Sequence, residues 1–114
     1  VQYVNMVDSA YLKIYPDAGN ITNAAVENQH DVCEDHTLGK GKLIALHLKE
    51  TKPDVYREVP FLTGHVEFER IINTAWKLGV RRYVTELWDV GQPQWKEDIC
   101  FANRSMKRLL NAAQ

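Results

Sequence analysis

The stretch Leu43-Ile44-Ala45-Leu46-His47-Leu48-Lys49-Glu50-Thr51-Lys52-Pro53 decides the fold. Five of its first six residues are apolar, which predicts a strand buried on both faces, as in a parallel sheet. The second half is polar and begins at His47, followed by Lys49 and Glu50. Ligands of α/β proteins bind beyond the carboxyl ends of parallel strands. We therefore predict that this strand end forms the floor of an active site.

Strands and helices alternate along the rest of the chain. The pattern predicts the end of a helix at 1–9, strands at 11–15, 42–48 and 82–88, helices at 22–38, 68–78 and 95–109, and a long loop at 49–65. The helix at 68–78 has the clearest apolar periodicity, and Gly79 follows it. Such alternation is typical of βαβ units, so we expect one α/β unit with parallel strands over residues 1–114.

The composition excludes several classes of partner. Among 114 residues, 45% are hydrophobic and 25% are charged, with a net charge of -1, so the chain has no basic field for nucleic acid. No apolar run approaches the ~18 residues that span a bilayer, so we expect no membrane insertion. The two cysteines, Cys33 and Cys100, lie far apart and are expected to be free thiols in the cytoplasm, although one disulfide stays open.

Each predicted strand ends in a residue that can bind a metal. Asp17, His47 and Glu86 are separated by 30 and 39 residues, about one βα unit each. Parallel strands would bring all three to one edge of the sheet, and this donor set suits Mn²⁺, Zn²⁺, Co²⁺ or Fe²⁺. Taken singly, the aspartate also suits a turn, the histidine a packed position and the glutamate a solvated loop. The remaining histidines are not expected to be ligands, and two of them are predicted to lie on a polar helix face: His30, His36 and His65.

Four segments together resemble one enzyme family in order and spacing. They are Tyr15–Asn20, Ala45–Pro53, Val59–Arg70 and Thr85–Trp88. The sequence is similar to the L-ribulose-5-phosphate (L-xylulose-5-phosphate) 3-epimerases, whose members are often labelled hexulose-6-phosphate isomerases. These enzymes are xylose-isomerase-like TIM barrels. The resemblance covers roughly residues 10 to 110, and its most specific part is the run from His47 to Pro53.

The resemblance implies that these residues form the C-terminal three βα units of a (β/α)₈ barrel, strands six to eight. A complete barrel needs about 250 residues, so we expect an incomplete barrel that associates into a homo-oligomer. By the same resemblance Asp17, His47 and Glu86 match three of four metal ligands, and the fourth is a glutamate on the preceding strand. Asn20 matches a substrate-contacting position. A Gly-x-Gly turn is expected after Phe61, but residues 62–65 read Leu-Thr-Gly-His, which leaves the sugar open.

The implied reaction is epimerisation at C3 of a ketopentose 5-phosphate, with Glu86 as one of two acid/base carboxylates and a divalent cation as cofactor. Lys49 and Lys52 are candidates for contacts with phosphate or enediolate, and the alternative is that both are solvated loop lysines. Gly64 and Trp88 are further candidate substrate contacts, and the loop before Phe68 is a candidate phosphate site. Because one ligand and one acid/base group are missing, we expect these 114 residues alone to be inactive.

Two other functions stay open at this point. The labels of the family allow an aldose–ketose isomerase acting on a hexulose 6-phosphate. The chain can also be a non-enzymatic α/β module that binds a partner through its three tryptophans, Trp76, Trp88 and Trp95. The metal-dependent endonucleases of the same superfamily are disfavoured, because 14 basic residues face 15 acidic ones.

Overall fold

A computed structural model describes all 114 residues, from Val1 to Gln114. Along the chain it has α1 (Gln2–Val7), α2 (Ala18–Asn28), α3 (Val32–Thr37), β1 (Leu46–Leu48), α4 (Phe68–Lys77), β2 (Tyr83–Thr85) and α5 (Trp95–Ala113). The two strands are parallel, with Leu46 opposite Tyr83 and Leu48 opposite Thr85. The predicted α/β class and parallel order are therefore confirmed.

The first predicted strand is present only in part. Residues 11–15 form no regular strand, and the chain runs beside β1 through two isolated parallel bridges, Ile14 with Leu43 and Asp17 with His47. Ile14 and Asp17 are three residues apart, whereas their partners Leu43 and His47 are four residues apart. The 43–47 segment therefore contains one extra residue, a bulge. Between the two bridges stands Pro16, which has no N–H to donate but accepts a 2.9 Å hydrogen bond from the His47 amide.

The other two strands are shorter than predicted. The spans 42–48 and 82–88 each contain only three strand residues, β1 and β2. Their pairing begins where Leu46 N–H donates to the Arg82 carbonyl and ends where Glu86 N–H donates to the Leu48 carbonyl, at 3.0 and 2.9 Å. No backbone hydrogen bond joins the two segments beyond these two bonds.

The single helix predicted at 22–38 is wrong, because the chain breaks it into α2 and α3. Asp17 caps α2 through a 2.8 Å bond from the Asn20 amide, so the helix begins four residues earlier. Gln29 adopts a left-handed conformation (φ 56°) and ends α2. Asp31 then caps α3 by accepting from the amides of Cys33 and Glu34.

Helix α3 carries an ion pair to α4 and a buried histidine. Asp31 also pairs with Arg70 of α4, and this guanidinium, together with the capping amides, lowers the pKa of the Asp31 carboxyl. His36 is buried, which corrects its predicted place on a polar face. Its Nδ1 lies 2.7 Å from the Val32 carbonyl, so Nδ1 carries the proton, and Nε2 has no partner. Burial lowers the pKa of His36.

The last two helices follow the predicted apolar pattern, with one exception. Helix α4 buries Phe68, Ile71, Ile72 and Ala75, as its apolar periodicity predicts. Gly79 follows the helix and has a positive φ of 93°. Helix α5 buries Ala102 and Met106 near its middle. Its first turns are instead exposed: Trp95 (46%) and Ile99 (39%) line a surface depression together with residues of the 87–92 segment.

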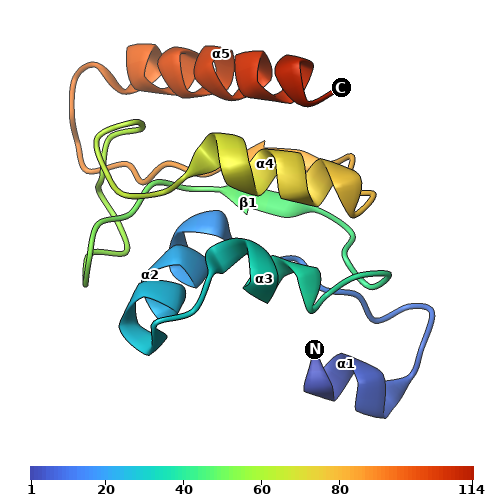
Figure 1. Cartoon of the computed structure of the whole chain (residues 1–114). Coiled ribbons are helices and arrows are strands. Elements are labelled where there is room, and N and C mark those ends of the chain that lie inside the picture. The colour runs from blue at the N-terminus through green and yellow to red at the C-terminus, as the bar shows by residue number, and fades with distance from the viewer.

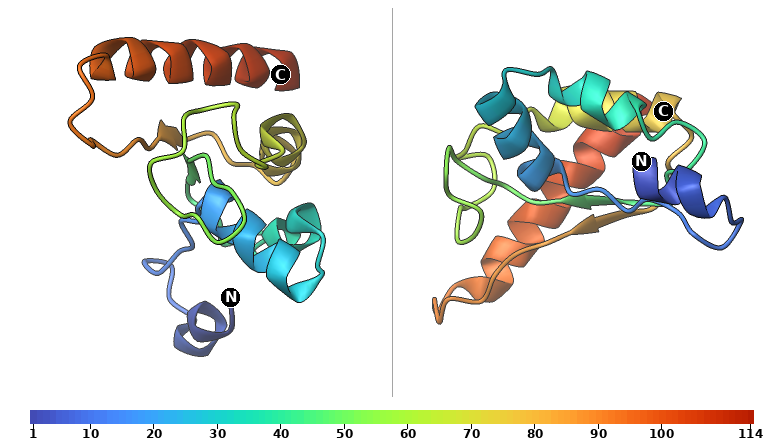
Figure 2. Two further views of the ribbon diagram at one scale, coloured as in Figure 1. Left: turned by 90° about the vertical axis from the view of Figure 1, so that its left-hand side faces the viewer. Right: turned by 90° about the horizontal axis from the view of Figure 1, so that it is seen from below.

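The core lies between the helices and one face of the strands. In Figure 1, α4 lies in front of β1, with α3 on one side of α4 and α5 on the other, and the right-hand view of Figure 2 shows α3 and α4 on the same side of the strands. Fourteen buried residues form one cluster that includes Leu46 and Leu48 of β1. Of the side chains that alternate to the other face, Val84 of β2 is uncovered (47% exposed). The structure thus shows part of a parallel α/β fold and shows no closed barrel.

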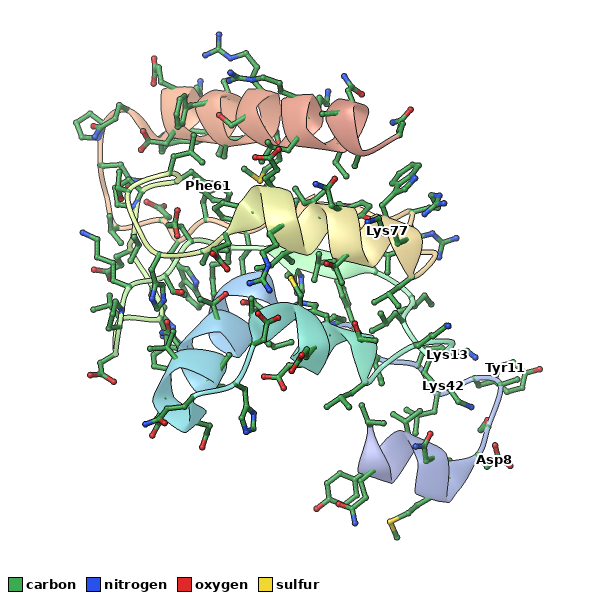
Figure 3. The ribbon with its side chains drawn as sticks, in the orientation of Figure 1. Asp8, Tyr11, Lys13, Lys42, Phe61 and Lys77 are labelled. Atoms are coloured by element: carbon green, nitrogen blue, oxygen red, sulfur yellow. The ribbon has the colours of Figure 1, made fainter.

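The N-terminal segment is loosely attached to the rest. Val4 is the only buried residue of α1, and Asp8 reaches Lys42 at 4.0 Å. Figure 3 shows Tyr11 projecting away from the protein near this pair, and its side chain is 99% exposed. None of the helices combines the length and the apolar character needed to cross a bilayer.

Candidate metal and substrate site

The three strand-end residues lie together at the carboxyl edge of the sheet. One donor atom from each of Asp17, His47 and Glu86 lies within 4.8 Å of the others. His47 is the middle residue of β1, Glu86 directly follows β2, and Asp17 forms a parallel bridge with His47. The strand pairing therefore positions all three, as the spacing of the sequence predicts.

Backbone and ring contacts orient two of these donors. Oδ1 of Asp17 caps α2, which leaves Oδ2 directed toward the cluster. The imidazole of His47 stacks on the Tyr15 ring with centroids 4.0 Å apart and planes 17° apart, and its Nδ1 lies 3.9 Å from Glu86 Oε2. Two carboxylates and one imidazole are the donor types of Mn²⁺, Zn²⁺ and Co²⁺ sites, so the residues present fit a divalent cation.

Lys49 is a buried member of the same cluster. Its Nζ lies 3.6 Å from Asp17 Oδ2 and 3.9 Å from Glu86 Oε1, and the residue is only 7% exposed. The alternative of a solvated loop lysine is therefore wrong for Lys49. Lys49 lies two residues after His47 on the same face, opposite Glu86, so the strand register places its ammonium group there. A buried ammonium without a carboxylate partner would be strongly unfavourable, and here it has two.

A pocket of about 570 Å³ lies over the cluster. Besides Asp17, His47, Lys49 and Glu86 it is lined by Tyr15, Asn20, Tyr56, Arg57 and Trp88. Asn20, Lys49 and Trp88 thus lie where the sequence predicts substrate contacts. Two other candidates, Lys52 and Gly64, do not line this pocket.

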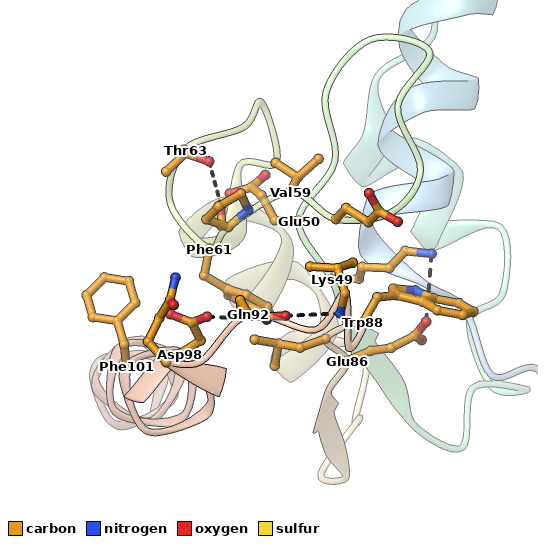
Figure 4. A pocket seen from close by; sticks show the side chains of 15 residues that line it. Lys49, Glu50, Val59, Phe61, Thr63, Glu86, Trp88, Gln92, Asp98 and Phe101 are labelled. Carbon is orange, nitrogen blue, oxygen red and sulfur yellow. Dashed lines mark hydrogen bonds and ion pairs between the residues drawn. The ribbon is translucent and has the colours of Figure 1, made fainter. Parts of the chain in front are cut away.

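A second cavity of about 410 Å³ adjoins the first (Figure 4). Lys49 and Glu86 face each other across its edge, and Trp88 lies beside them. Its remaining wall comes from the 58–63 loop, residues 87–94 and the start of α5. The two cavities share three lining residues, so they form adjoining parts of one depression around Lys49 and Glu86.

The buried carboxylate of Glu50 organises the loop between β1 and α4, a role beyond those predicted from the sequence. Its Oε2 accepts a 2.9 Å bond from the Leu62 amide, and its Oε1 accepts from the Thr51 and Val66 amides at 3.2 and 3.1 Å. An acidic residue directly after a buried strand is the signal that points to such a role. The bonded amides of Leu62 and Val66 are no longer available to a phosphate, which counts against the loop before α4 as the phosphate site.

Gly64 packs against this carboxylate. A Cβ at position 64 would lie 2.0 Å from the Thr51 carbonyl and 2.5 Å from Glu50 Oε1, so only glycine fits there. The adjacent His65 is half-buried and bonds Asn23 and Thr51 through Nε2. Gly64 therefore shapes the loop by its lack of a side chain.

Comparison with known proteins confirms the resemblance to the epimerases. No family model matches the chain. Over 87 residues it is 37% identical to the L-ribulose-5-phosphate 3-epimerases UlaE of Salmonella paratyphi A, Escherichia coli (strain K12 / DH10B) and Shigella boydii serotype 18. The matched region is 75% of this chain, and it corresponds to 29% of the length of these curated relatives.

Proposed function

We propose that the protein containing these residues catalyses metal-dependent epimerisation at C3 of a ketopentose 5-phosphate, interconverting L-xylulose 5-phosphate and L-ribulose 5-phosphate. The observation that carries this proposal is the cluster of Asp17, His47, Lys49 and Glu86 at one sheet edge. The relatives are named as 3-epimerases, and their names favour neither a hexulose-6-phosphate isomerase nor a binding module.

In this proposal Asp17, His47 and Glu86 hold a divalent cation, Mn²⁺, Zn²⁺ or Co²⁺. When bound, the cation would polarise the ketone next to C3 and stabilise the negative charge that develops as the C3 proton leaves. The two carboxylates bring negative charge to the cation, and the imidazole adds a directional donor. The cluster lies at the floor of the 570 Å³ pocket, so a small sugar phosphate can reach it.

Glu86 acts as one acid/base group. Its Oε2 faces His47 and its Oε1 faces Lys49, each at 3.9 Å, so the carboxylate lies between an imidazole and an ammonium group. It would take the C3 proton from one face of the sugar, and a second acid would return a proton to the opposite face. By the family resemblance this second acid is a glutamate on the preceding strand. We therefore expect the 114 residues by themselves to show no turnover.

The surroundings of the site are part of the proposal. We infer that the chain forms the last three βα units of a TIM barrel, in a cytoplasmic homo-oligomer. The uncovered strand face around Val84 supports this arrangement, because further strands or a second copy would remove its apolar side chains from water.

The test uses the full-length protein with Mn²⁺ and L-xylulose 5-phosphate in D₂O. NMR should show deuterium entering at C3, and Glu86→Gln should slow this exchange by at least ~100-fold, because an amide cannot accept the proton. Glu27→Gln, an exposed glutamate of α2, is the matched control. Electron paramagnetic resonance of Mn²⁺ gives a separate readout, in which Asp17→Asn should weaken binding. Undiminished exchange in Glu86→Gln, or no Mn²⁺ bound, would refute the proposal.

A further inference from the structure

The imidazole of His47 is not oriented by a hydrogen bond. Its Nδ1 lies 3.9 Å from Glu86 Oε2, which is beyond hydrogen-bonding distance, and neither ring nitrogen bonds another protein group. The rings of His36 and His65, by contrast, each have a nitrogen in a hydrogen bond. A histidine that binds a metal is commonly oriented by such a bond from its second ring nitrogen. For His47 the orienting contact must therefore be of another kind.

The ring of Tyr15 supplies this contact. It lies nearly parallel to the His47 imidazole, with the centroids 4.0 Å apart and an angle of 17° between the planes. The χ2 torsion of a histidine has broad minima and by itself fixes the plane of the ring only weakly. If the imidazole turned about this torsion, its edge would approach the face of the Tyr15 ring and the stacked contact would be lost. The stack therefore restricts the imidazole to one plane.

The backbone around Tyr15 holds its ring beside His47. Tyr15 precedes Asp17 by two residues, and Asp17 forms the parallel bridge with His47. Between them, the Pro16 carbonyl accepts a 2.9 Å hydrogen bond from the His47 amide. On the other side of Tyr15, Ile14 bonds the neighbouring segment through its own N–H and carbonyl groups, at 2.8 and 3.0 Å. Three consecutive residues thus contact His47, by a ring, a carbonyl and a bridge.

Tyr15 has no other structural task in the chain. Its side chain is 44% exposed and is not a member of the buried cluster, so it does not fill the core. Its hydroxyl bonds no other residue, whereas the hydroxyl of Tyr83 donates to the Val80 carbonyl. Tyr11, four residues earlier in the same segment, is 99% exposed. Among these tyrosines only Tyr15 lies against a residue of the candidate metal site.

We propose that Tyr15 is a positioning residue, which holds the His47 imidazole in the plane that a divalent cation requires at the cluster of Asp17, His47 and Glu86. This inference rests on the metal site of the proposed function and does not depend on which sugar is the substrate. Tyr15 donates no ligand atom and acts through His47. Because the stack orients the ring before a cation binds, binding costs less rotational freedom of the imidazole, and the affinity of the site is higher.

The experiment titrates the full-length protein with Mn²⁺ and follows the free ion by electron paramagnetic resonance. Tyr15→Leu removes the ring and should weaken Mn²⁺ binding by about 10-fold, as the loss of an orienting partner does at other metal sites. Tyr15→Phe keeps the ring without the hydroxyl and should bind Mn²⁺ as the unchanged protein does. Tyr15→Gln replaces Tyr15→Leu if that variant is unstable. Tyr11→Leu is the matched control, an exposed tyrosine of the same segment, and should have no effect.

Visible absorption of the Co²⁺-loaded protein gives a second readout, because the bands respond to the geometry of the ligands. The bands should change in Tyr15→Leu and stay unchanged in Tyr15→Phe. A loss of affinity in Tyr15→Leu that Tyr15→Phe restores supports the positioning role, even if no deuterium exchange at C3 is found. Unchanged affinity and bands in Tyr15→Leu, or equal losses in both variants, would overturn it and leave the epimerase proposal intact. An unchanged protein that binds no Mn²⁺ would overturn both.

Discussion

Replacing Glu50 by glutamine should unfold the loop that borders the site. Glutamine has nearly the same shape, but it has one acceptor oxygen where the carboxylate has two. The three amides bonded by Glu50 approach both oxygens, Leu62 on one side and Thr51 with Val66 on the other. Whichever way the amide is oriented, its NH₂ group would point at one or two backbone N–H groups.

The expected loss follows from this geometry. In the better orientation the glutamine oxygen keeps two weakened bonds, one bond is lost, and two donors face each other in a buried position. A hydrogen bond to a charged group contributes about 1.5–3 kcal/mol, and an unsatisfied buried donor costs about 1–3 kcal/mol. Since the lost bond and the unsatisfied donor overlap in part, we expect Glu50→Gln to lower the free energy of unfolding by about 3 kcal/mol.

Urea denaturation of the 114-residue chain, followed by circular dichroism at pH 7, measures this loss directly. Glu27→Gln is the control, because that exposed glutamate has no bonded partner and should change the free energy of unfolding by less than about 0.5 kcal/mol. If Glu50→Gln were as stable as the control, the buried carboxylate would not organise the loop. Lys49 and Arg57, which flank this part of the loop, would then owe their positions to other contacts.

Two further changes test the packing around the site and inside the helical layer. Gly64→Ala should destabilise the chain by about 3 kcal/mol or more in the same assay, because its Cβ would overlap the Thr51 carbonyl, whereas Gly41→Ala, with open space around it, should lose only about 1–2 kcal/mol through its positive φ. Equal losses would contradict the packing argument. Burial lowers the pKa of His36 below its unfolded value of 6.5, so the unfolded state takes up a proton first as the pH falls. Stability should therefore fall below pH 6.5 by at most about 1.4 kcal/mol per pH unit, until the folded pKa is reached. His36→Asn, which keeps a donor for the Val32 carbonyl, should remove this part of the pH dependence, and an unchanged urea profile between pH 7 and 5 would show that another group causes it.

Much of the site could be predicted because it follows from local order along the chain. A strand that ends in His47, with Asp17 and Glu86 about one βα unit on either side, is enough to bring three donors to one edge. Helix α4 was equally predictable, since its apolar residues recur at helical spacing and its end is marked by Gly79. Both predictions use only the spacing of residue types along the sequence.

The remaining features depend on contacts between residues far apart in the chain. Nothing local distinguishes the buried Lys49 and Glu50 from ordinary loop charges. The partners of Lys49 are Asp17 and Glu86, and the partners of Glu50 are backbone amides of the 51–66 loop. The stacking of Arg57 on Trp88 likewise joins residues far apart in the chain, so no local pattern predicts it.

The sequence by itself determined the parallel α/β order and the three donors. The order follows from the alternation of strand-like and helix-like segments, and the donors follow from the polar residues at the end of each strand-like segment. Only the tertiary structure decided where β1 and β2 end, because a ladder extends only as far as its partner does, and it showed that a left-handed Gln29 ends α2. It also decided which charges are buried and paired, because pairing depends on distances between separate segments of the chain.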